Sequence, residues 1–232
     1  MPPTSTAEAV RTATMNDVPG VARVLGRAFA NDPLPRWLFP ADDTRMARTV
    51  RLSAIVAGFG HIPRADASVA ESPSTASPST ASRKNEPPPT DAADAPSPPV
   101  IQGAALWNPP EGGSEGTSFL LRSLPHLAAL VGVRRVPDVV RYLGEVAHSR
   151  PEEPHWYLSM LGTDPVARGT GVGSRLLRTG LARADADGVP VYLETMNSAN
   201  LGYYERFDFR VVRVLNDSRY PSTYCLMRGA AA

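Results

Sequence analysis

The chain has 232 residues, with 24 basic and 23 acidic side chains and a formal net charge of +1. This length fits one domain, or one domain with a small appendage. Only one of the basic residues, Lys84, is a lysine, so a Walker-type phosphate loop, which needs a lysine after its glycines, is excluded. The single cysteine, Cys225, excludes a disulfide framework within the chain and a zinc site made mainly of thiolates.

The same composition bounds the partners and the compartment. The near-zero net charge gives no field that favours nucleic acid as a partner. No run approaches the roughly 18 apolar residues of a membrane span, and the start MPPTSTAEAV lacks the charged and apolar regions of a signal peptide. The four histidines show no paired metal-binding spacing. We therefore expect a cytoplasmic monomer or homodimer with no metal, no nucleic-acid partner and no membrane partner.

Many of the 24 prolines fall in one segment. Eight of them lie in residues 71–100, where 22 of 30 residues are Pro, Ser, Thr or Ala and no aromatic residue, Leu, Ile or Met is present. Such a segment has no apolar surface to offset the entropy of ordering it. We expect residues 71–99 to be a disordered insertion within a single domain of residues 9–229, with flexible termini at 1–8 and 230–232. A tolerated surface insertion is favoured over a docking role, because loop length costs little stability.

The N-terminal half alternates apolar segments with proline-rich ones. Residues 9–15 are typical of a short strand, and Asp17 can cap the helix that follows it. The segment 31–43 contains three prolines and is predicted to be a loop. The further elements expected in this half are a helix at 44–60, a strand that begins at residue 100, and helices at 117–132 and 137–149.

The last third of the chain has the most regular pattern. The predicted elements are a strand at 155–162, a helix at 171–187, a strand at 189–195, a helix at 199–207, and strands at 209–215 and 222–228. Strand, helix, strand and helix followed by two adjacent strands indicate a mixed sheet with helices packed against it. The predicted fold class is therefore α/β (α+β).

A glycine-rich turn stands between the first strand and the first helix of this region. Its sequence, DPVARGTGVGS, has glycines at 169, 171 and 173. Glycines at alternate positions allow a tight turn that brings backbone N–H groups close to a ligand, here at the positive end of a helix. A diphosphate is the expected guest. The spacing differs from the dinucleotide motif G-x-G-x-x-G, so an ordinary strand-to-helix loop is the alternative on the glycines alone.

The segment from Arg168 to Ser174, together with Leu161-Gly162-Thr163 before it, resembles the R/Q-x-x-G-x-G/A acetyl-CoA signature of the GNAT superfamily of N-acetyltransferases. The resemblance continues through LETMNSANLGYYERFDF and, more weakly, through the opening RTATMNDVPGVARVLGRAF. Within the superfamily, PEEPHWYLSMLGTDP, GVPVYLET and NLGYYERFDF are most similar to puromycin N-acetyltransferases and their actinobacterial relatives. The specific similarity lies in the C-terminal third.

The resemblance implies a fold and a cofactor site. The fold is a GNAT-like mixed, mostly antiparallel central sheet, flanked by helices on both faces and splayed at the acetyl-CoA site. Backbone groups of Leu161, Gly162 and Thr163 would pair with the pantetheine of acetyl-CoA, and Asn200 stands at a cofactor contact. The residues whose amides would cradle the pyrophosphate are Arg168, Gly169, Thr170, Gly171, Val172, Gly173 and Ser174.

Two residues are the candidates for catalysis. Acetyl transfer to an amine needs a neutral nucleophile and a stabilised thiolate leaving group. Glu194, near the end of a predicted strand, can act as the base or hold the cationic amine, or can be a salt-bridged structural residue. Tyr204 matches the tyrosine of the superfamily's FY-E segment, whose phenol serves as general acid; core packing is its alternative.

Two residues depart from the pattern of the relatives. Asp208 stands where they carry glycine at a helix end that favours a left-handed backbone, a conformation that Asp tolerates better than most residues. Gly202 stands where the most similar relatives carry proline. Neither change removes a catalytic group.

The function predicted from the sequence is acetyl transfer from acetyl-CoA, used as a co-substrate, to the primary amine of a small molecule by direct attack. An antibiotic or an aminonucleoside is among the acceptors considered. The alternatives are a non-catalytic acyl-CoA-binding sensor or interaction module, and a protein or peptide N-acetyltransferase.

Overall fold

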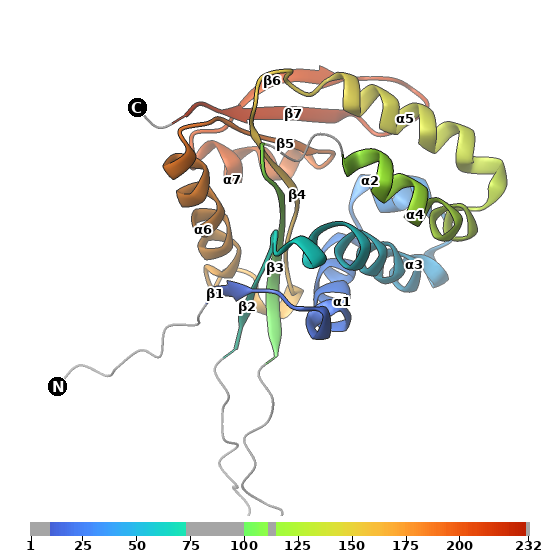
Figure 1. Ribbon diagram of the computed structural model, residues 1–232. Coiled ribbons are helices and arrows are strands. Elements are labelled where there is room, and N and C mark those ends of the chain that lie inside the picture. The colour runs from blue at the N-terminus through green and yellow to red at the C-terminus, as the bar shows by residue number, and fades with distance from the viewer. Residues whose placement is uncertain (1–9, 73–99, 111–114, 231–232) are drawn as a thin grey trace, which may run out of the picture.

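The computed structural model describes residues 10–72, 100–110 and 115–230 of the chain. The predicted flexible N-terminus and nearly all of the predicted insertion lie outside these residues. The described residues form one sheet with the strand order β1-β2-β3-β4-β5-β7-β6 (Figure 1). The strands are β1 Val10–Thr12, β2 Ala67–Glu71, β3 Ile101–Asn108, β4 Trp156–Thr163, β5 Val191–Thr195, β6 Arg210–Leu215 and β7 Thr223–Arg228.

Neighbouring strands of this sheet are antiparallel except β4 and β5, which are parallel. The helices are α1 Val18–Phe29, α2 Pro33–Leu38, α3 Asp42–Ile55, α4 Glu115–Val131, α5 Val136–His148, α6 Val172–Asp187 and α7 Leu201–Glu205. None of the described helices is long and apolar enough to cross a membrane. This architecture confirms the predicted fold class and the mostly antiparallel sheet.

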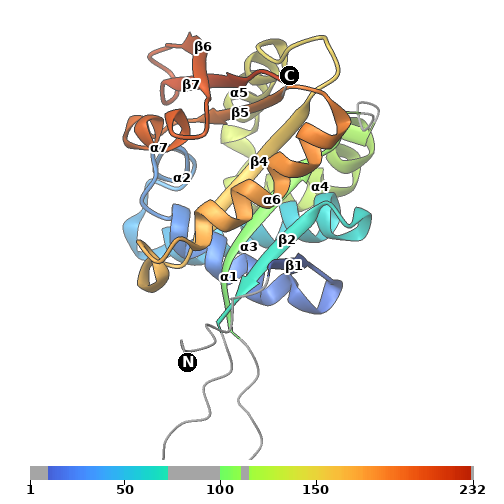
Figure 2. The ribbon, with the colours of Figure 1, turned by 90° about the vertical axis from the view of Figure 1, so that its left-hand side faces the viewer.

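Both faces of the sheet are covered by helices, as β3 shows by the alternation of its side chains. Ala105 and Trp107 belong to the core cluster that contains the apolar face of α6, whereas Ala104 and Leu106 belong to the cluster that contains the apolar face of α1. Successive side chains of a strand point to opposite faces. The two helices therefore lie on opposite sides of the sheet, and Figure 2 shows α6 crossing the face turned to the viewer.

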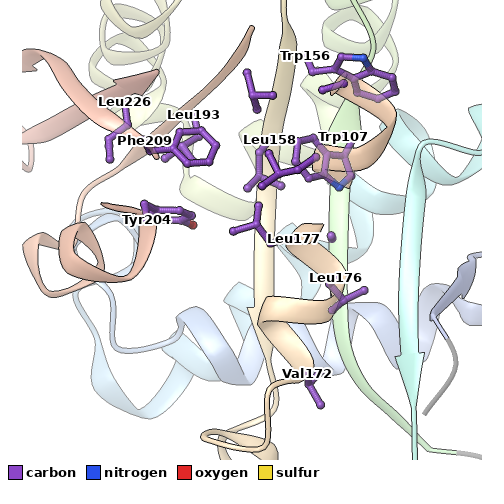
Figure 3. Packing of buried hydrophobic residues seen from close by; sticks show 14 of the residues in the cluster. Trp107, Trp156, Leu158, Val172, Leu176, Leu177, Leu193, Tyr204, Phe209 and Leu226 are labelled. Atoms are coloured by element: carbon purple, nitrogen blue, oxygen red, sulfur yellow. The ribbon is translucent and has the colours of Figure 1, made fainter. Parts of the chain in front are cut away.

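The core on the α6 face joins the two halves of the sheet. Leu158 of β4 and Leu193 of β5 are 3% and 1% exposed, and Leu177 of α6 packs in the same cluster (Figure 3). The indole rings of Trp107 and Trp156 meet edge to face, with centroids 6.2 Å apart, which is a favoured aromatic geometry. This packing holds α6 against β3 and β4 and so determines where the first turn of α6 lies.

The segment predicted as a proline-rich loop contains a helix, α2, and that prediction was wrong for residues 33–38. Pro33 and Pro35 occupy the first and third positions of α2. Proline is tolerated there because the first N–H groups of a helix have no intrahelical acceptor in any case. Leu38, the last residue of α2, and Phe39 after it are buried and supply the apolar contacts that a short helix needs.

Two further boundaries differ from the prediction. The strand β2 was not predicted and runs through Glu71, so the first residue of the predicted insertion belongs to the sheet. The helix predicted over 44–60 is regular only to Ile55 and continues as a π-helical segment, Val56–His61. The left-handed backbone predicted at Asp208 is confirmed, with φ of 65°.

Among the described glycines, Gly180 of α6 is the one where an added Cβ would meet its nearest neighbour at the shortest distance. A Cβ there would lie 2.1 Å from Cζ2 of the fully buried Trp107 ring, whereas a Cβ on Gly144 of α5 would meet nothing within 4 Å. We expect Gly180→Ala to lower the free energy of unfolding by about 1–3 kcal/mol, because the ring or the helix has to move. Urea denaturation monitored by circular dichroism measures this change.

The matched control is Gly144→Ala, which replaces the same residue at a half-buried position of α5 with open space around its Cβ. It should raise the free energy of unfolding by about 0.5–1 kcal/mol, the ordinary gain for replacing a helical glycine. Equal effects of the two substitutions would contradict the assignment of Gly180 as the contact that sets the distance between α6 and the sheet.

Candidate active site

The site begins where the parallel strands separate. β4 and β5 are paired only from Trp156 to Leu158 on β4 and from Val191 to Leu193 on β5, although both strands continue further. On its other edge β4 stays paired with β3 as far as Thr163, with a register shift that skips Ser159. The edge of β4 beyond Leu158 therefore turns its backbone groups away from β5 and toward a cavity.

A cavity of about 620 Å³ lies beside this open edge. It gathers ten of the eleven residues predicted from the acetyl-CoA signature: Leu161, Gly162, Thr163, Arg168, Gly169, Gly171, Val172, Gly173, Ser174 and Asn200. The eleventh, Thr170, does not line the cavity; its hydroxyl donates a hydrogen bond of 2.8 Å to the carbonyl of Ala167. Thr170 therefore stabilises the turn from within, and the binding role of the other ten stays a prediction.

Two glycines just before the first turn of α6 have the backbone conformations that a tight turn into a helix requires. Gly169 and Gly171 have φ values of 81° and 88°, in the left-handed region that glycine adopts at little cost. Gly171 is also the N-cap of α6 and has no side chain to occupy the helix end. The N–H groups of the first turn of α6 have no intrahelical acceptors, and the helix dipole places partial positive charge there.

The residues at this helix end fit a diphosphate. Tyr203 lines the same cavity, and its hydroxyl is buried there beside the side chain of Ser174. The arginines 168 and 206 also line the cavity, and Arg168 is tied to α1 by a hydrogen bond of 3.1 Å to the carbonyl of Ala28. Backbone amides, a hydroxyl donor and guanidinium groups are the donors that bind phosphate oxygens.

A second cavity, of about 320 Å³, adjoins the first. Its walls come from α1 to α5, from α7 and from the separated ends of β4 and β5, and are mainly apolar. Examples of its wall residues are Leu38, Leu52, Val131, Val139 and Val146. The residues that line both cavities are Phe29, Asp32, Leu161, Asn200 and Tyr204. Because the two cavities share these residues, molecules bound in each would meet there.

Tyr204 lies at this junction. Its side chain is 8% exposed, and its ring meets Phe209 edge to face at 5.8 Å while the hydroxyl end is directed toward β4 (Figure 3). Burial, with smaller contributions from Tyr203 and Asp32, raises the pKa of Tyr204 far above its ordinary value. The phenol is therefore protonated throughout the neutral range and has a proton to donate.

Glu194 lines only the second cavity, where it is already paired. Its carboxylate lies 3.3 Å from Nε of Arg150, and its side chain is 3% exposed. The guanidinium of Arg150 stacks on Tyr157 at 4.0 Å from the ring centroid. Burial, followed by the charge of Glu194, raises the pKa of Tyr157 well above its ordinary value. Glu194 and Arg150 thus form a compensated ion pair in the wall of an apolar cavity.

Asp32 is a residue of this site that the sequence did not single out. It is half-buried, lies just before α2, and lines both cavities. Its carboxylate accepts a hydrogen bond of 3.2 Å from Nδ2 of Asn197, which lies 165 residues further along the chain. Burial raises the pKa of Asp32, against the opposing effects of the Asn197 hydrogen bond and the charge of Arg168. No local pattern marks Asp32, because it stands in a segment that was predicted to be a loop.

The comparison with protein families agrees with this geometry. The family model described as "Acetyltransferase (GNAT) family" matches residues 85–209, which is more than half of the chain. The chain therefore belongs to the GNAT acetyltransferase family and is an acyltransferase. The predicted superfamily is confirmed, and the closer similarity to puromycin N-acetyltransferases stays a prediction.

Solved structures with the same fold include several acetyltransferases. One is described as histone acetyltransferase HPA2 and related acetyltransferase from Corynebacterium glutamicum ATCC 13032; it is 27% identical, with a TM-score of 0.65, and 97% of each chain is covered. Arylalkylamine N-acetyltransferase 2 from Aedes aegypti is 10% identical, with a TM-score of 0.59, over 96% of this chain and 99% of that one. An N-acetyltransferase from Staphylococcus aureus Mu50 is 11% identical, with a TM-score of 0.54, over 94% and 99% of the two chains. The last two show the fold alone.

The first turn of α6 offers a test of the predicted cofactor residues. A Cβ on Gly173 would lie 3.0 Å from Oγ1 of Thr163 and 3.5 Å from the hydroxyl of Tyr203. We expect Gly173→Val to weaken acetyl-CoA binding by about tenfold or more, equal to about 1.4 kcal/mol, because its methyl groups occupy the space next to the N–H groups. Isothermal titration calorimetry with acetyl-CoA measures the affinity.

Gly202→Ala is the control for this variant, because a Cβ on Gly202 of α7 would meet nothing within 4 Å. It should bind acetyl-CoA as the unmodified protein does. If a folded Gly173→Val protein, judged by its circular dichroism and melting temperature, binds acetyl-CoA with unchanged affinity, the diphosphate does not sit at this helix end.

Proposed function

We propose that the protein transfers an acetyl group from acetyl-CoA to the primary amine of a small molecule by direct attack. The observation that carries the proposal is the meeting of two cavities at Tyr204. The first has amides and arginines for a diphosphate, and the second has apolar walls for an acceptor. Direct transfer requires that the thioester and the amine meet in this way, without a covalent intermediate on the protein.

The residues have distinct proposed roles. Acetyl-CoA, when bound, supplies an acetyl group on a thiolate leaving group. The open edge of β4 at Leu161 to Thr163 would hold the pantetheine, and the first turn of α6 would hold the diphosphate. Tyr204 would donate its phenolic proton to the departing sulfur, as a general acid.

The acceptor cavity favours a small molecule over a polypeptide. Its walls are contributed by helices α1 to α5, by α7 and by strands β4 and β5, so that the acceptor's body is surrounded from several sides. A pocket with mainly apolar walls and a few polar groups is typical of small-molecule sites. The resemblance of the C-terminal third to puromycin N-acetyltransferases makes an aminonucleoside antibiotic one acceptor to test.

An assay of thiol release from acetyl-CoA over a panel of primary amines tests the proposal. The panel holds arylalkylamines, alkylamines, polyamines, puromycin and short peptides with free N-termini. We expect turnover with at least one small amine. Acetyl-CoA binding by calorimetry without thiol release for any amine would instead support a sensor, and turnover with peptides alone would support a peptide acetyltransferase.

Within this assay Tyr204→Phe isolates the general acid. The substitution keeps the ring and its contact with Phe209 and removes the proton donor, so kcat should fall by about 10²-fold or more while the affinity for acetyl-CoA is kept. Tyr224→Phe, the same change on β7 outside both cavities, should leave turnover unchanged. Wild-type turnover by Tyr204→Phe would remove Tyr204 from the mechanism.

We propose that Glu194 acts through Arg150 and is a positioning residue. In Glu194→Gln the guanidinium is left without its partner in the acceptor cavity, where it repels a cationic amine and bears an uncompensated charge. The KM for the amine should rise by about tenfold, a cost of about 1.4 kcal/mol. Steady-state kinetics over the amine concentration measures KM and kcat separately.

The double variant Arg150→Gln/Glu194→Gln distinguishes this role from that of a base. It removes both charges, so that this part of the cavity wall is neutral again. The KM for the amine should therefore fall most of the way back to the value of the unmodified protein. If Glu194 were the base, kcat would fall in both variants and the second substitution would restore nothing.

A further inference from the structure

Asp32 is the only carboxylate among the five residues that both cavities share. Glu194, the other acidic residue of the acceptor cavity, lines that cavity alone and is paired with Arg150. A group that meets the acceptor's nitrogen as it attacks the thioester has to stand at the junction. Asp32 occupies this place, and Tyr204 stands there too.

The carboxylate of Asp32 can contact a ligand because it does not cap helix α2. Asp32 is the N-cap of α2, a position where an Asp side chain normally accepts a bond from the second or third N–H of the helix. The third residue here is Pro35, which has no N–H, and Asp32 makes no side-chain cap.

Asn197 orients the carboxylate instead. Its Nδ2 donates to Oδ1 of Asp32 at 3.2 Å, while its own Oδ1 accepts from the backbone N–H of Ala199 at 3.1 Å. The second bond determines which end of the amide faces Asp32. One oxygen of Asp32 is therefore held in place, and the other, Oδ2, receives no hydrogen bond from the residues that the structure describes.

The charged and titratable groups that face Asp32 make it a suitable base. Arg168, before α6, and the amide of Asn197, before α7, favour its ionised form, whereas burial favours the neutral form and prevails, so the pKa is raised. Tyr204, on α7, is uncharged at neutral pH. A carboxylate whose pKa is raised toward neutrality accepts a proton more readily than an ordinary one.

Among the charged wall residues of the acceptor cavity that the structure describes, Asp32 is the one without an ion-pair partner, and Arg168 acts on it only from the first cavity. The charged wall residues are Asp32, Arg150 and Glu194, and the last two neutralise each other. The remaining wall is mainly apolar. One negative charge at the junction and apolar walls beyond it match a molecule with a single ammonium group at one end and an apolar body.

We propose that Asp32 binds the acceptor's ammonium group and takes its proton, and that the acceptor is a primary monoamine with an aryl or alkyl body. The proposal rests on the proposed function and names the substrate class and the base for it. A dication such as a polyamine would leave its second charge unpaired in the apolar part of the cavity, at a high desolvation cost.

Two protons leave the nitrogen in the proposed step. The ammonium gives its first proton to Oδ2 of Asp32, and the neutral nitrogen forms a bond to the acetyl carbonyl carbon. The carbon–sulfur bond breaks with its electron pair on sulfur, which takes the proton of Tyr204. The second nitrogen proton restores the Tyr204 phenol, and Asp32 releases its proton to solvent, so one amide, one thiol and one proton are formed.

The variant Asp32→Asn tests the proposal in the full-length protein. Asparagine keeps the shape and the N-cap preference but neither accepts the proton nor attracts the ammonium group. With phenylethylamine as acceptor, kcat/KM should fall by about 100-fold or more near pH 7 while the acetyl-CoA affinity changes by less than about twofold. Asp43→Asn, on an exposed carboxylate of α3, is the matched control and should keep full activity.

The pH dependence separates this role from a structural one. A free alkyl amine has a pKa near about 10.4, so its neutral fraction rises with pH and the need for a base declines. The deficit of Asp32→Asn should narrow to about tenfold or less near pH 9.5. A deficit that is the same at both pH values, or activity within threefold of the unmodified protein near pH 7, overturns the assignment of Asp32.

The acceptor panel tests the substrate class. The unmodified protein should prefer phenylethylamine or hexylamine over agmatine and spermidine by about tenfold or more in kcat/KM, as expected for one unpaired charge. A preference for a dication or a peptide overturns the monoamine assignment. If the unmodified protein acetylates no amine, the proposed function fails and the inference fails with it. If the unmodified protein acetylates an amine and Asp32→Asn is equally active, the proposed function holds and the inference alone fails.

Discussion

The geometry of the site depends on the one parallel pair of strands in the described sheet. β4 and β5 run in the same direction, so the chain has to return between them through a crossover, and α6 is that crossover. The carboxyl ends of both strands and the N-terminus of α6 therefore lie at the same edge of the sheet. Because the two strands are paired at only three positions, they separate at this edge, and the cavities occupy the gap.

The charges around the gap are arranged so that few are left uncompensated. A buried charge is costly unless it is paired. In the proposed function the first cavity would meet negative phosphates with backbone amides and arginine, which agrees with a chain that has a single lysine. In the second cavity Glu194 and Arg150 compensate each other, so that Asp32 alone supplies a charge at the junction. The difference between the two acids comes from their neighbours and cannot be inferred from residue type.

Elements with a strong local pattern were predictable. The helix α6 combines glycines before its first turn with apolar residues at helical spacing, and it was predicted to within a residue. The helix α2 was missed because proline usually interrupts helices, and its two prolines are tolerated only by their position in the first turn. The strand β2 is five residues long and three of its residues are Ala or Ser, so only its pairing with β1 and β3 makes it a strand.

The sequence by itself determined the glycine-rich turn before α6 and the family, and it made Tyr204 a candidate for catalysis, because each depends on residues that are close together in the chain. Only the tertiary structure decided which carboxylate lies where the two cavities meet. Asp32 and Asn197 are 165 residues apart, and Glu194 and Arg150 are 44 residues apart, so neither pair leaves a local pattern. The packing of α1, α2 and α7 around the separated strands brings Asp32 to the junction and leaves Glu194 in the cavity wall, since contacts between distant segments are set by the fold as a whole.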